Sequence, residues 1–293
     1  MAVIQTNGLT KYYGKTRGIE NLDLTVEKGD IFGFIGPNGA GKSTTIRTLL
    51  GLIKPTSGSA SVLGLDIVKD KVEILKQVGY MPSEAIFYGD MKVSEIIKLS
   101  ADLRRADCAQ RAKDLCERLA LDTGKKIRSL SLGNRKKVGI VCAFQHDVPL
   151  YILDEPTSGL DPLMQKEFFT LLNERSKAGA TVFLSSHVLS ELQRYCLHAA
   201  IIRDGYLIKN GRVGELSKTA ARRVTLHGVS APPALDGLRD VRTLPESVSF
   251  LYSGDIKALL AALNGLPLTD LSITEPDIEE VFMHYYTKED EKA

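Results

Sequence analysis

The sequence predicts an α/β fold: a mostly parallel β-sheet with helices on both faces, followed by a small α+β extension. Strand-like apolar segments alternate with helical patterns up to about residue 215, as in parallel sheets built from strand–helix–strand units. Three segments, at 150–153, 181–184 and 199–202, are strongly apolar, which is typical of strands buried on both faces. The alternation ends near residue 215, so we expect a large domain at 1–215 and a smaller one at 216–293.

The elements of the first domain are expected in the following order. Strands are predicted at 3–9, 22–26 and 31–35, a helix from Gly41 to near Gly51, and a further strand at 76–81. Helical patterns cover 93–120, 131–146 and 162–178, with Ser131 at an N-cap and Pro162 in a first turn. The stretch at about 84–130 interrupts the alternation and is expected to form a separate helical lobe.

The extension has a different pattern. Residues 222–227 and 247–252 alternate like edge strands, and 256–264 has a helical period. The charged residues 287–293 are expected to fray.

The bulk composition excludes several classes of protein. The 38 basic and 36 acidic residues give a net charge of +2, without the basic excess typical of nucleic-acid-binding domains. The cysteines, Cys108, Cys116, Cys142 and Cys196, form no CxxC pair, so we expect idle thiols rather than metal ligands. No secretory signal is visible, and the longest apolar run, 138–144, is far shorter than the ~18 residues that span a bilayer. We therefore expect a cytoplasmic protein that reaches a membrane only through a partner.

A phosphate-binding loop is predicted at 36–43. These residues match G-x-x-x-x-G-K-[ST] and stand between a predicted strand and a predicted helix. Glycines let the backbone wrap a polyphosphate, and a helix N-terminus attracts the anion. Lys42 is expected to reach the β- and γ-phosphates, Ser43 to ligate Mg²⁺, and Thr44 to offer a further hydroxyl. The expected nucleotide contacts in this loop are Gly36, Pro37, Asn38, Gly39, Ala40, Gly41, Lys42, Ser43 and Thr44.

Two carboxylates, Asp154 and Glu155, end the apolar strand at 150–153. Buried carboxylates are unfavourable unless they are paired or bind a cation, so this strand end indicates a magnesium site. Asp154 is expected to hold the metal, and Glu155 to orient and deprotonate the attacking water. His187 follows the next strand, where ligand groups gather in parallel sheets, and is expected to contact the γ-phosphate or that water. Lys42, Glu155 and His187 are thus the predicted catalytic residues.

The order and spacing of five motifs resemble the ATP-binding domains of ABC transporters. The motifs are the loop 36–43, Leu-Ser-Leu-Gly-Asn at 130–134, Asp154-Glu155, Ser158-Gly-Leu-Asp161 and His187. The resemblance covers residues 3–215. More narrowly, 153–162 and the C-terminal 276–282 are similar to ATPase subunits of bacterial ABC-2-type exporters. The resemblance implies a P-loop NTPase fold of ABC type, with antiparallel N-terminal strands, a mostly parallel core sheet and a helical subdomain.

The resemblance also implies roles for individual residues. Tyr13 would stack on adenine, with a buried core tyrosine as the alternative. Ser131 and Gly133 would contact the γ-phosphate held by a second subunit, and Asp161 would couple the two sites. One chain has one phosphate loop and one Leu-Ser-Leu-Gly-Asn motif. A complete site would therefore need a second ATP-binding subunit, identical or different. ATP and Mg²⁺ are the implied cofactors. A membrane permease is the other implied partner, at the inner face of the cell membrane, and no nucleic acid is expected.

The sequence departs from the family pattern at three positions. Leu132 and Asn134 replace a glycine and the glutamine of the usual Leu-Ser-Gly-Gly-Gln signature. Ser83 stands where the family has a glutamine that senses magnesium and the permease, and either Glu84 or water would have to replace it. Basal hydrolysis is therefore expected to be slow or dependent on a partner.

The segment from Glu84 to about residue 105 corresponds to the permease-docking region of the family. Phe87, Tyr88 and Met91 are expected to be exposed there, with ordinary helix packing as the alternative.

The sequence is compatible with three functions to different degrees. The first is the energy-coupling subunit of a membrane exporter, which dimerises around ATP and hydrolyses it. The second is a soluble ATPase of the same type that acts on ribosomes or DNA; the single ATP-binding domain, the lack of a zinc module or long coiled coil and the mild charge disfavour it. The third, a non-catalytic regulator, is disfavoured because Lys42, Asp154, Glu155 and His187 are all present.

Overall fold

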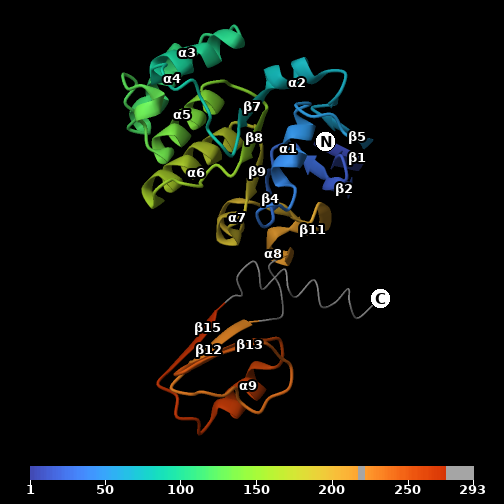
Figure 1. Ribbon diagram of the computed structural model, residues 1–293, viewed down its shortest axis with the longest axis vertical. Helices are drawn as coiled ribbons and strands as arrows, with labels where there is room; N and C mark the ends of the chain where they lie inside the picture. The colour runs from blue at the N-terminus through green and yellow to red at the C-terminus, as the bar shows by residue number, and fades with distance from the viewer. Residues whose placement is uncertain (217–221, 275–293) are drawn as a thin grey trace. The chain divides into compact units, whose positions relative to one another are not determined.

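The computed structural model describes residues 1–216 and 222–274. The chain divides into two compact units, 1–213 and 214–293 (Figure 1). Two predictions lie outside the described residues. They are the C-terminal segment at 276–282, which resembles exporter ATPase subunits, and the frayed end expected at 287–293.

The N-terminal strands form an antiparallel sheet in the order β2-β1-β5-β6, with β3 also paired to β1. The strands are β1 (Ala2–Tyr13), β2 (Thr16–Leu22), β3 (Thr25–Glu27), β5 (Ser57–Val62) and β6 (Leu65–Asp66). The antiparallel arrangement is confirmed, but the single strand predicted at 22–26 is wrong. Asn21 has a left-handed backbone, with φ of 49°, and the Leu24 N–H donates to the Thr6 hydroxyl at 2.8 Å. The chain therefore turns between β2 and β3.

The core sheet has six strands in the order β11-β10-β4-β9-β8-β7. Its strands are β4 (Ile31–Ile35), β7 (Val78–Met81), β8 (Leu150–Asp154), β9 (Thr181–Ser186), β10 (His198–Arg203) and β11 (Tyr206–Arg212). Every neighbouring pair is parallel except the β10–β11 hairpin. The prediction of a mostly parallel core sheet is confirmed.

The first unit contains helices that were predicted from the sequence and helices that were not. They are α1 (Lys42–Leu49), α2 (Lys71–Gln77), α3 (Val93–Leu103), α4 (Ala109–Arg118), α5 (Leu132–Phe144), α6 (Pro162–Lys177), α7 (Leu189–Tyr195) and α8 (Val213–Leu216), which continues into the second unit. Ser131 caps α5 as predicted, because its hydroxyl accepts the Asn134 N–H at 3.3 Å. Helices α2, α7 and α8 were not predicted, whereas the others begin at or close to the expected residues. Helix α2 takes up the first two residues of the strand expected at 76–81.

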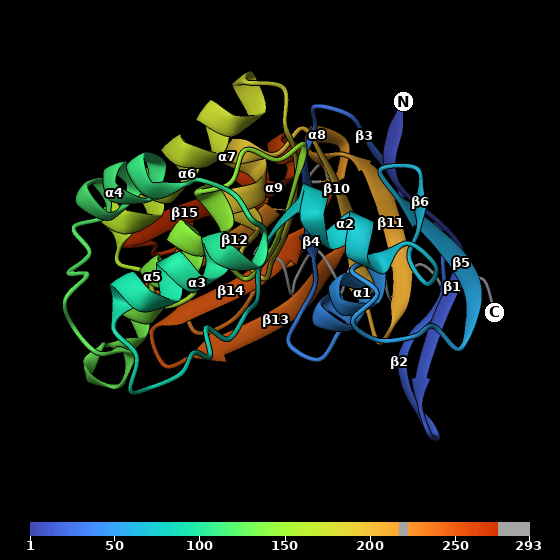
Figure 2. The same cartoon turned by 90° about the horizontal axis from the view of Figure 1, so that it is seen from above.

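Successive side chains of the core strands face two different layers. Ile152 and Phe183 are register partners and belong to the apolar core that includes α1 and the antiparallel sheet. Tyr151 points to the opposite face, where its ring stacks on Phe144 of α5 at 4.8 Å, and Phe144 in turn meets Phe168 of α6 edge-on. In Figures 1 and 2 the core sheet accordingly lies between α1 with the antiparallel strands on one side and α5 with α6 on the other.

The second unit contains a four-stranded antiparallel sheet in the order β13-β14-β12-β15 and one described helix. Its elements are β12 (Arg222–His227), β13 (Leu238–Leu244), β14 (Ser247–Tyr252), α9 (Ile256–Leu263) and β15 (Asp270–Thr274). The prediction that 222–227 and 247–252 are edge strands is wrong, because β12 and β14 are the two central strands. Their alternation arises because Leu226 and Phe250 share one apolar cluster with Leu259 of α9.

The four cysteines are free thiols. Cys108, Cys116 and Cys196 are buried, and burial raises the pKa of each of these thiols. Since the thiolate is the reactive and metal-binding form, these cysteines are poor nucleophiles and ligands. In the described part of the chain, no group of three or more His, Cys, Asp or Glu side chains is arranged to hold a metal ion. No helix within the same residues is both long and apolar enough to cross a bilayer.

His146 makes the stability of the first unit depend on pH. Its side chain is 4% exposed, and its Nδ1 lies 3.4 Å from Cys108 Sγ. Burial, followed by the charges of Arg104 and Arg111, lowers the pKa of His146 from 6.5 to about 4. Between these two values the unfolded chain binds a proton that the folded chain does not bind. Stability is therefore complete above the unfolded pKa and falls by roughly 3 kcal/mol as the pH drops to the folded pKa.

Replacing His146 with glutamine, which does not titrate, is expected to flatten this dependence. The measurement is the Tm of the purified chain at several pH values between about 4 and 7. His227→Gln removes an exposed histidine and should keep the parental pH profile. A His146→Gln chain whose Tm still falls as steeply as that of the parent would contradict the assignment.

Candidate functional site

The phosphate loop connects β4 to α1, as predicted. Two of its glycines stand where no side chain fits. A Cβ on Gly36 would lie 2.3 Å from the carbonyl oxygen of Ile202, and one on Gly41 would lie 2.6 Å from that of Gly18. Gly41 also has a φ of 106°, which residues with a Cβ rarely adopt. The loop can therefore keep its backbone close to a bound anion at the start of α1.

A cavity of about 320 Å³ lies over this loop. Its lining comprises Tyr13, Arg17 and Gly18 near the β1–β2 turn, Pro37, Asn38, Gly39, Ala40, Gly41, Lys42, Ser43 and Thr44 from the loop and α1, and Ser83 and Glu155. Of the loop residues predicted to contact nucleotide, only Gly36 is absent from this lining. The Tyr13 ring is 46% exposed, so it is not part of the apolar core.

Lys42 is buried at the floor of the cavity, with 5% of its surface exposed. Its ammonium group donates to the carbonyl oxygens of Gly36 at 2.6 Å and Pro37 at 3.1 Å. It also lies 3.0 Å from Oε1 of Glu155. The lysine thus holds the loop closed on itself, and its positive charge is paired with the Glu155 carboxylate.

Asp154 is almost fully buried at the end of β8, with 1% exposure. Its Oδ1 accepts a hydrogen bond from the Ser185 hydroxyl at 2.6 Å. Its Oδ2 is also buried and has no hydrogen-bond partner among the described residues. A buried carboxylate oxygen without a partner is unfavourable, and a hydrated cation would satisfy it. A carboxylate together with the Ser43 hydroxyl is a donor set that fits Mg²⁺ bound with phosphates.

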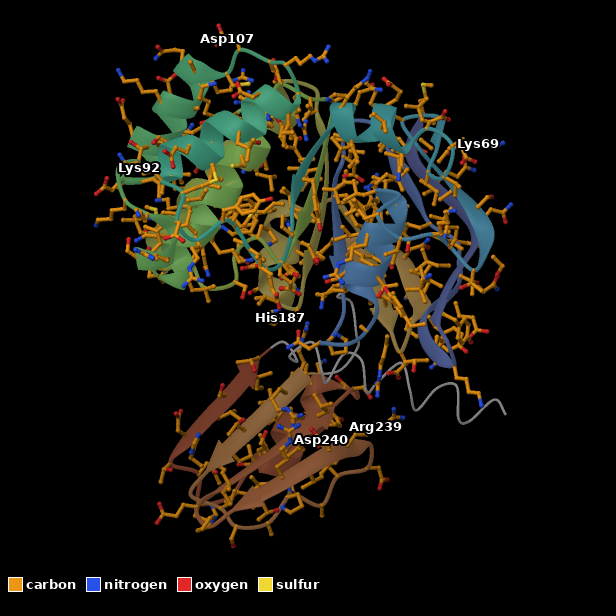
Figure 3. All side chains as sticks on the ribbon, turned by 45° about the horizontal axis from the view of Figure 1, so that its top comes forward. Lys69, Lys92, Asp107, His187, Arg239 and Asp240 are labelled. Carbon is orange, nitrogen blue, oxygen red and sulfur yellow. The ribbon has the colours of Figure 1, made fainter. Side chains whose placement is uncertain are left out.

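Glu155 joins the phosphate loop to His187. Its backbone has a φ of 47°, and its N–H donates to the Ser185 hydroxyl at 3.0 Å. Its Oε2 lies 2.8 Å from Nδ1 of His187, while Oε1 faces Lys42. His187, labelled in Figure 3, follows β9 and has a 48% exposed side chain. The three residues predicted to be catalytic therefore form one connected group.

A hydrogen-bonded network fixes the turn that carries Tyr13. Glu20 of β2 accepts from the hydroxyls of Tyr12 at 2.8 Å and Tyr206 at 2.7 Å, and these bonds lower the pKa of Glu20. Arg17 donates to the Asp204 carbonyl oxygen at 2.6 Å and lies over the Tyr206 ring at 4.3 Å. The β1–β2 hairpin is therefore attached to the β10–β11 hairpin at the edge of the cavity.

Ser131, Gly133 and Asp161 do not line this cavity. Ser131 and Asp161 are exposed and cap the starts of α5 and α6. Gly133 packs against the turn at Gly159, where a Cβ on Gly133 would lie 2.9 Å from the Gly159 carbonyl oxygen. The predicted site residues thus fall into two groups, one around Lys42 and one at the starts of α5 and α6.

The three positions at which the sequence differs from the family pattern all lie within the described residues. Ser83 lines the nucleotide cavity, whereas Glu84 is exposed and does not. Leu132 is 59% exposed and lies next to Gly159. Asn134 takes part in the cap of α5 through its backbone N–H.

Two residues at the site were not predicted from the sequence. Ser185 binds both the Asp154 carboxylate and the Glu155 N–H. Lys136 on α5 is 2% exposed and donates to the Glu155 carbonyl oxygen at 2.8 Å. The sequence could have predicted that Lys136 is buried. It lies four and eight residues before the apolar Ile140 and Phe144, and this spacing places all three on the same face of the helix.

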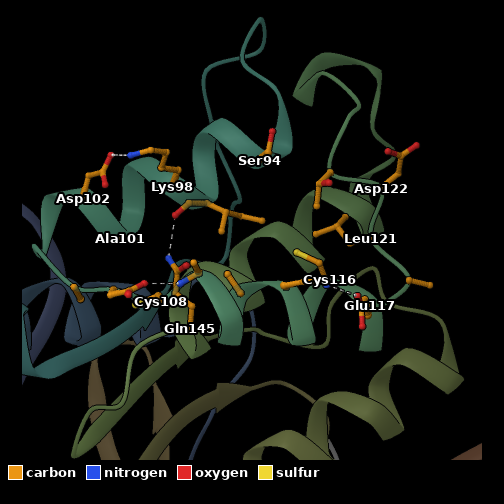
Figure 4. A pocket seen from close by; sticks show the side chains of 18 residues that line it. Ser94, Lys98, Ala101, Asp102, Cys108, Cys116, Glu117, Leu121, Asp122 and Gln145 are labelled. Atoms are coloured by element: carbon orange, nitrogen blue, oxygen red, sulfur yellow. Dashed lines mark hydrogen bonds and ion pairs between the residues drawn. The ribbon is translucent and has the colours of Figure 1, made fainter.

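A second, larger cavity of about 970 Å³ lies in the helical region between α3 and α4 (Figure 4). Its lining is mainly apolar, and Gln145, buried at its base, donates to the Ile97 carbonyl oxygen at 3.2 Å. Of the residues expected to be exposed nearby, Tyr88 is 71% exposed, whereas Phe87 and Met91 are half-buried. Ile86, which was not singled out, is 80% exposed.

A glycine-rich loop between a parallel strand and a helix, with acidic residues at the end of a neighbouring strand, defines a P-loop nucleoside triphosphatase. The family model described as ABC transporter matches residues 19–158. The chain is 33% identical to the bacitracin transport ATP-binding protein BcrA of Bacillus licheniformis and to the Nod factor export ATP-binding protein I of Cupriavidus metallidurans. Each alignment covers 96% of both chains. The chain therefore belongs to the ATP-binding proteins of ABC transporters, which bind ATP and hydrolyse it.

The solved structures agree with this assignment. One described as the structure of an ATP-binding subunit of an ABC transporter superposes with a TM-score of 0.69 at 31% sequence identity. It covers 74% of this chain and 92% of that one. The P-loop NTPase fold of ABC type is thereby confirmed.

Proposed function

We propose that this chain is the energy-coupling subunit of a membrane exporter, in which two ATP-binding subunits close around ATP and reopen after hydrolysis. The observation that carries the proposal is the linkage of Lys42, Glu155 and His187 beside the nucleotide cavity. The export direction is suggested by relatives whose names refer to bacitracin transport and Nod factor export. The permease would select the cargo, and the chain would lie at the cytoplasmic face of the membrane.

The cavity residues would act on one ATP molecule. Tyr13 would stack on adenine, and Lys42 would leave Glu155 to bind the β- and γ-phosphates. Ser43 and Asp154 would hold Mg²⁺, which neutralises phosphate charge, and the unpaired Oδ2 of Asp154 supports this role. Glu155 would take a proton from the attacking water, with His187 keeping its carboxylate in place.

The second group of residues would serve the partner subunit's nucleotide. Ser131 and Gly133 stand at the exposed start of α5, where backbone N–H groups favour a phosphate oxygen. Asp161 would couple the two sites. We propose a dimer because these residues do not reach the cavity of their own chain. Identical and non-identical partners are both compatible with this arrangement.

The permease is proposed to dock on the segment from Glu84 to about residue 105. Ile86, Tyr88 and Leu103 are 80%, 71% and 78% exposed, and clusters of exposed apolar side chains mark protein-binding surfaces. The adjoining α3–α4 cavity extends this surface.

Replacing both Ile86 and Tyr88 with alanine is expected to lower transport by about tenfold, because two apolar anchors of the interface are removed. ATP binding should remain parental, since neither residue lines the nucleotide cavity. The measurements are co-purification of a multi-span membrane protein with the tagged chain, transport in cells, and ATP affinity of the purified chain. Val72→Ala truncates a comparably exposed side chain on α2 and should leave all three unchanged.

Two outcomes would count against the proposed function. Equal loss of ATP binding and transport in the double variant would place these residues in the nucleotide site instead of the permease interface. Co-purification of the parent chain with ribosomes or DNA, instead of a membrane protein, would favour the soluble ATPase.

A further inference from the structure

Lys136 is a buried lysine beside the catalytic group. Only 2% of its surface is exposed, and burial lowers its pKa while the Asp154 and Glu155 carboxylates act in the opposite direction. Its ammonium group donates to the backbone carbonyl oxygen of Glu155 at 2.8 Å. Burying an ammonium group is unfavourable unless its interactions compensate. The hydrogen bond to the Glu155 carbonyl oxygen is one such compensating interaction.

The hydrogen bond from Lys136 is made to a residue whose backbone is strained, Glu155. Glu155 has a φ of 47°, in the left-handed region that residues with a Cβ avoid. Side chains hold both of its backbone polar groups: Ser185 accepts from the N–H at 3.0 Å, and Lys136 donates to the carbonyl. Because the backbone conformation sets the direction of the side chain, these two bonds help to aim the Glu155 carboxylate at His187 and Lys42.

Helix α5 also contacts the other end of the same turn. Gly133 packs on Gly159, where only 2.9 Å would separate an added Cβ from the carbonyl oxygen. The Leu132 side chain lies against the same glycine. The segment 155–159 is therefore held on α5 at both ends, by Lys136 at Glu155 and by the first turn of the helix at Gly159.

We propose that Lys136 is a positioning residue, which holds the Glu155 peptide in its hydrolytic conformation and makes that conformation depend on the position of α5. Lys136 does not touch the nucleotide; it acts through Glu155. This inference rests on the proposed function, in which Glu155 is the general base and the start of α5 grips the partner subunit's ATP. Binding of the partner subunit's ATP at the start of α5 would then help to position the Glu155 carboxylate that acts on the chain's own ATP.

The test replaces Lys136 with methionine, which is of similar length but lacks the charge and the donor. In the full chain, kcat for ATP hydrolysis should fall about 10- to 100-fold, the effect of losing one charged hydrogen bond at the transition state. KM and the equilibrium affinity for ATP should change less than about twofold, since Lys136 does not line the cavity. Lys136→Arg, which restores a charged donor, should recover part of kcat. Lys137→Met removes the neighbouring charge on α5 and should behave as the parent.

A double-mutant cycle tests whether Lys136 acts through Glu155. Adding Lys136→Met to Glu155→Gln should lower kcat little further, because the group that Lys136 positions no longer acts as a base. Independent losses that multiply would overturn the inference, as would a parental kcat in folded Lys136→Met. If the methionine variant does not fold, Lys136→Leu, which is apolar and also lacks a donor, takes its place, and a parental kcat would again overturn it. Failure of the parent chain to hydrolyse ATP even when it is assembled with its membrane partner would instead refute the proposed function.

Discussion

Glu155→Gln is expected to reduce ATP hydrolysis by ~10²–10⁴-fold, the usual contribution of a general base. Glutamine matches glutamate in size, so Ser185 and Lys136 can still hold the backbone. It cannot accept a proton from water. The chemical step is therefore lost while the shape of the site is kept.

The same substitution should preserve or tighten ATP binding. Oε1 of Glu155 lies 3.0 Å from the Lys42 ammonium, so the carboxylate would compete with a phosphate group for that charge. A neutral amide competes less well. Because the bound ATP is not hydrolysed, the ATP-bound dimer should also accumulate.

Three measurements on purified protein check these expectations: the hydrolysis rate, the Kd for ATP with Mg²⁺, and the molecular mass in solution with ATP. Glu73→Gln makes the same chemical change on the exposed surface of α2 and should leave all three parental. Hydrolysis at the parental rate by Glu155→Gln would show that another group is the base.

Lys42→Met is expected to weaken ATP binding by about 10²-fold, since it would remove the charged hydrogen bond that we propose between Lys42 and phosphate. The buried ammonium also holds the carbonyl oxygens of Gly36 and Pro37. Methionine cannot replace these bonds, so the loop should lose part of its order as well. Hydrolysis should fall with the loss of bound nucleotide.

The Kd for ATP, measured by calorimetry with Mg²⁺, tests this prediction. Lys69→Met removes an exposed lysine far from the loop in sequence (labelled in Figure 3) and serves as the control. An unchanged Kd in Lys42→Met would refute the assignment of the loop as the triphosphate site.

The local features of the site could be predicted because short stretches of sequence determine them. The phosphate loop needs glycines at fixed offsets, and close backbone contacts at Gly36 and Gly41 enforce them. Asp154 and Glu155 follow a wholly apolar strand, so their place at its carboxyl end could be predicted from the pattern alone.

Features that depend on distant pairing could not be predicted in this way. Strands β12 and β14 alternate like edge strands, yet they occupy the centre of their sheet because partners from 238–244 and 270–274 pair on their outer sides. The break between β2 and β3 is accompanied by a bond from the Leu24 N–H to the Thr6 hydroxyl, which joins residues 18 positions apart. Lys136 had a helical-period signal, but its contact with Glu155 joins residues 19 positions apart.

The attachment of the β1–β2 hairpin has a consequence for the order of assembly. Glu20, Arg17 and Tyr206 fix the Tyr13 turn using groups of a single protomer. The Tyr13 turn and the Lys42 loop are therefore held in place by contacts within one chain. A monomer should therefore load its nucleotide first, and pairing of the two loaded halves should be the later, concentration-dependent event.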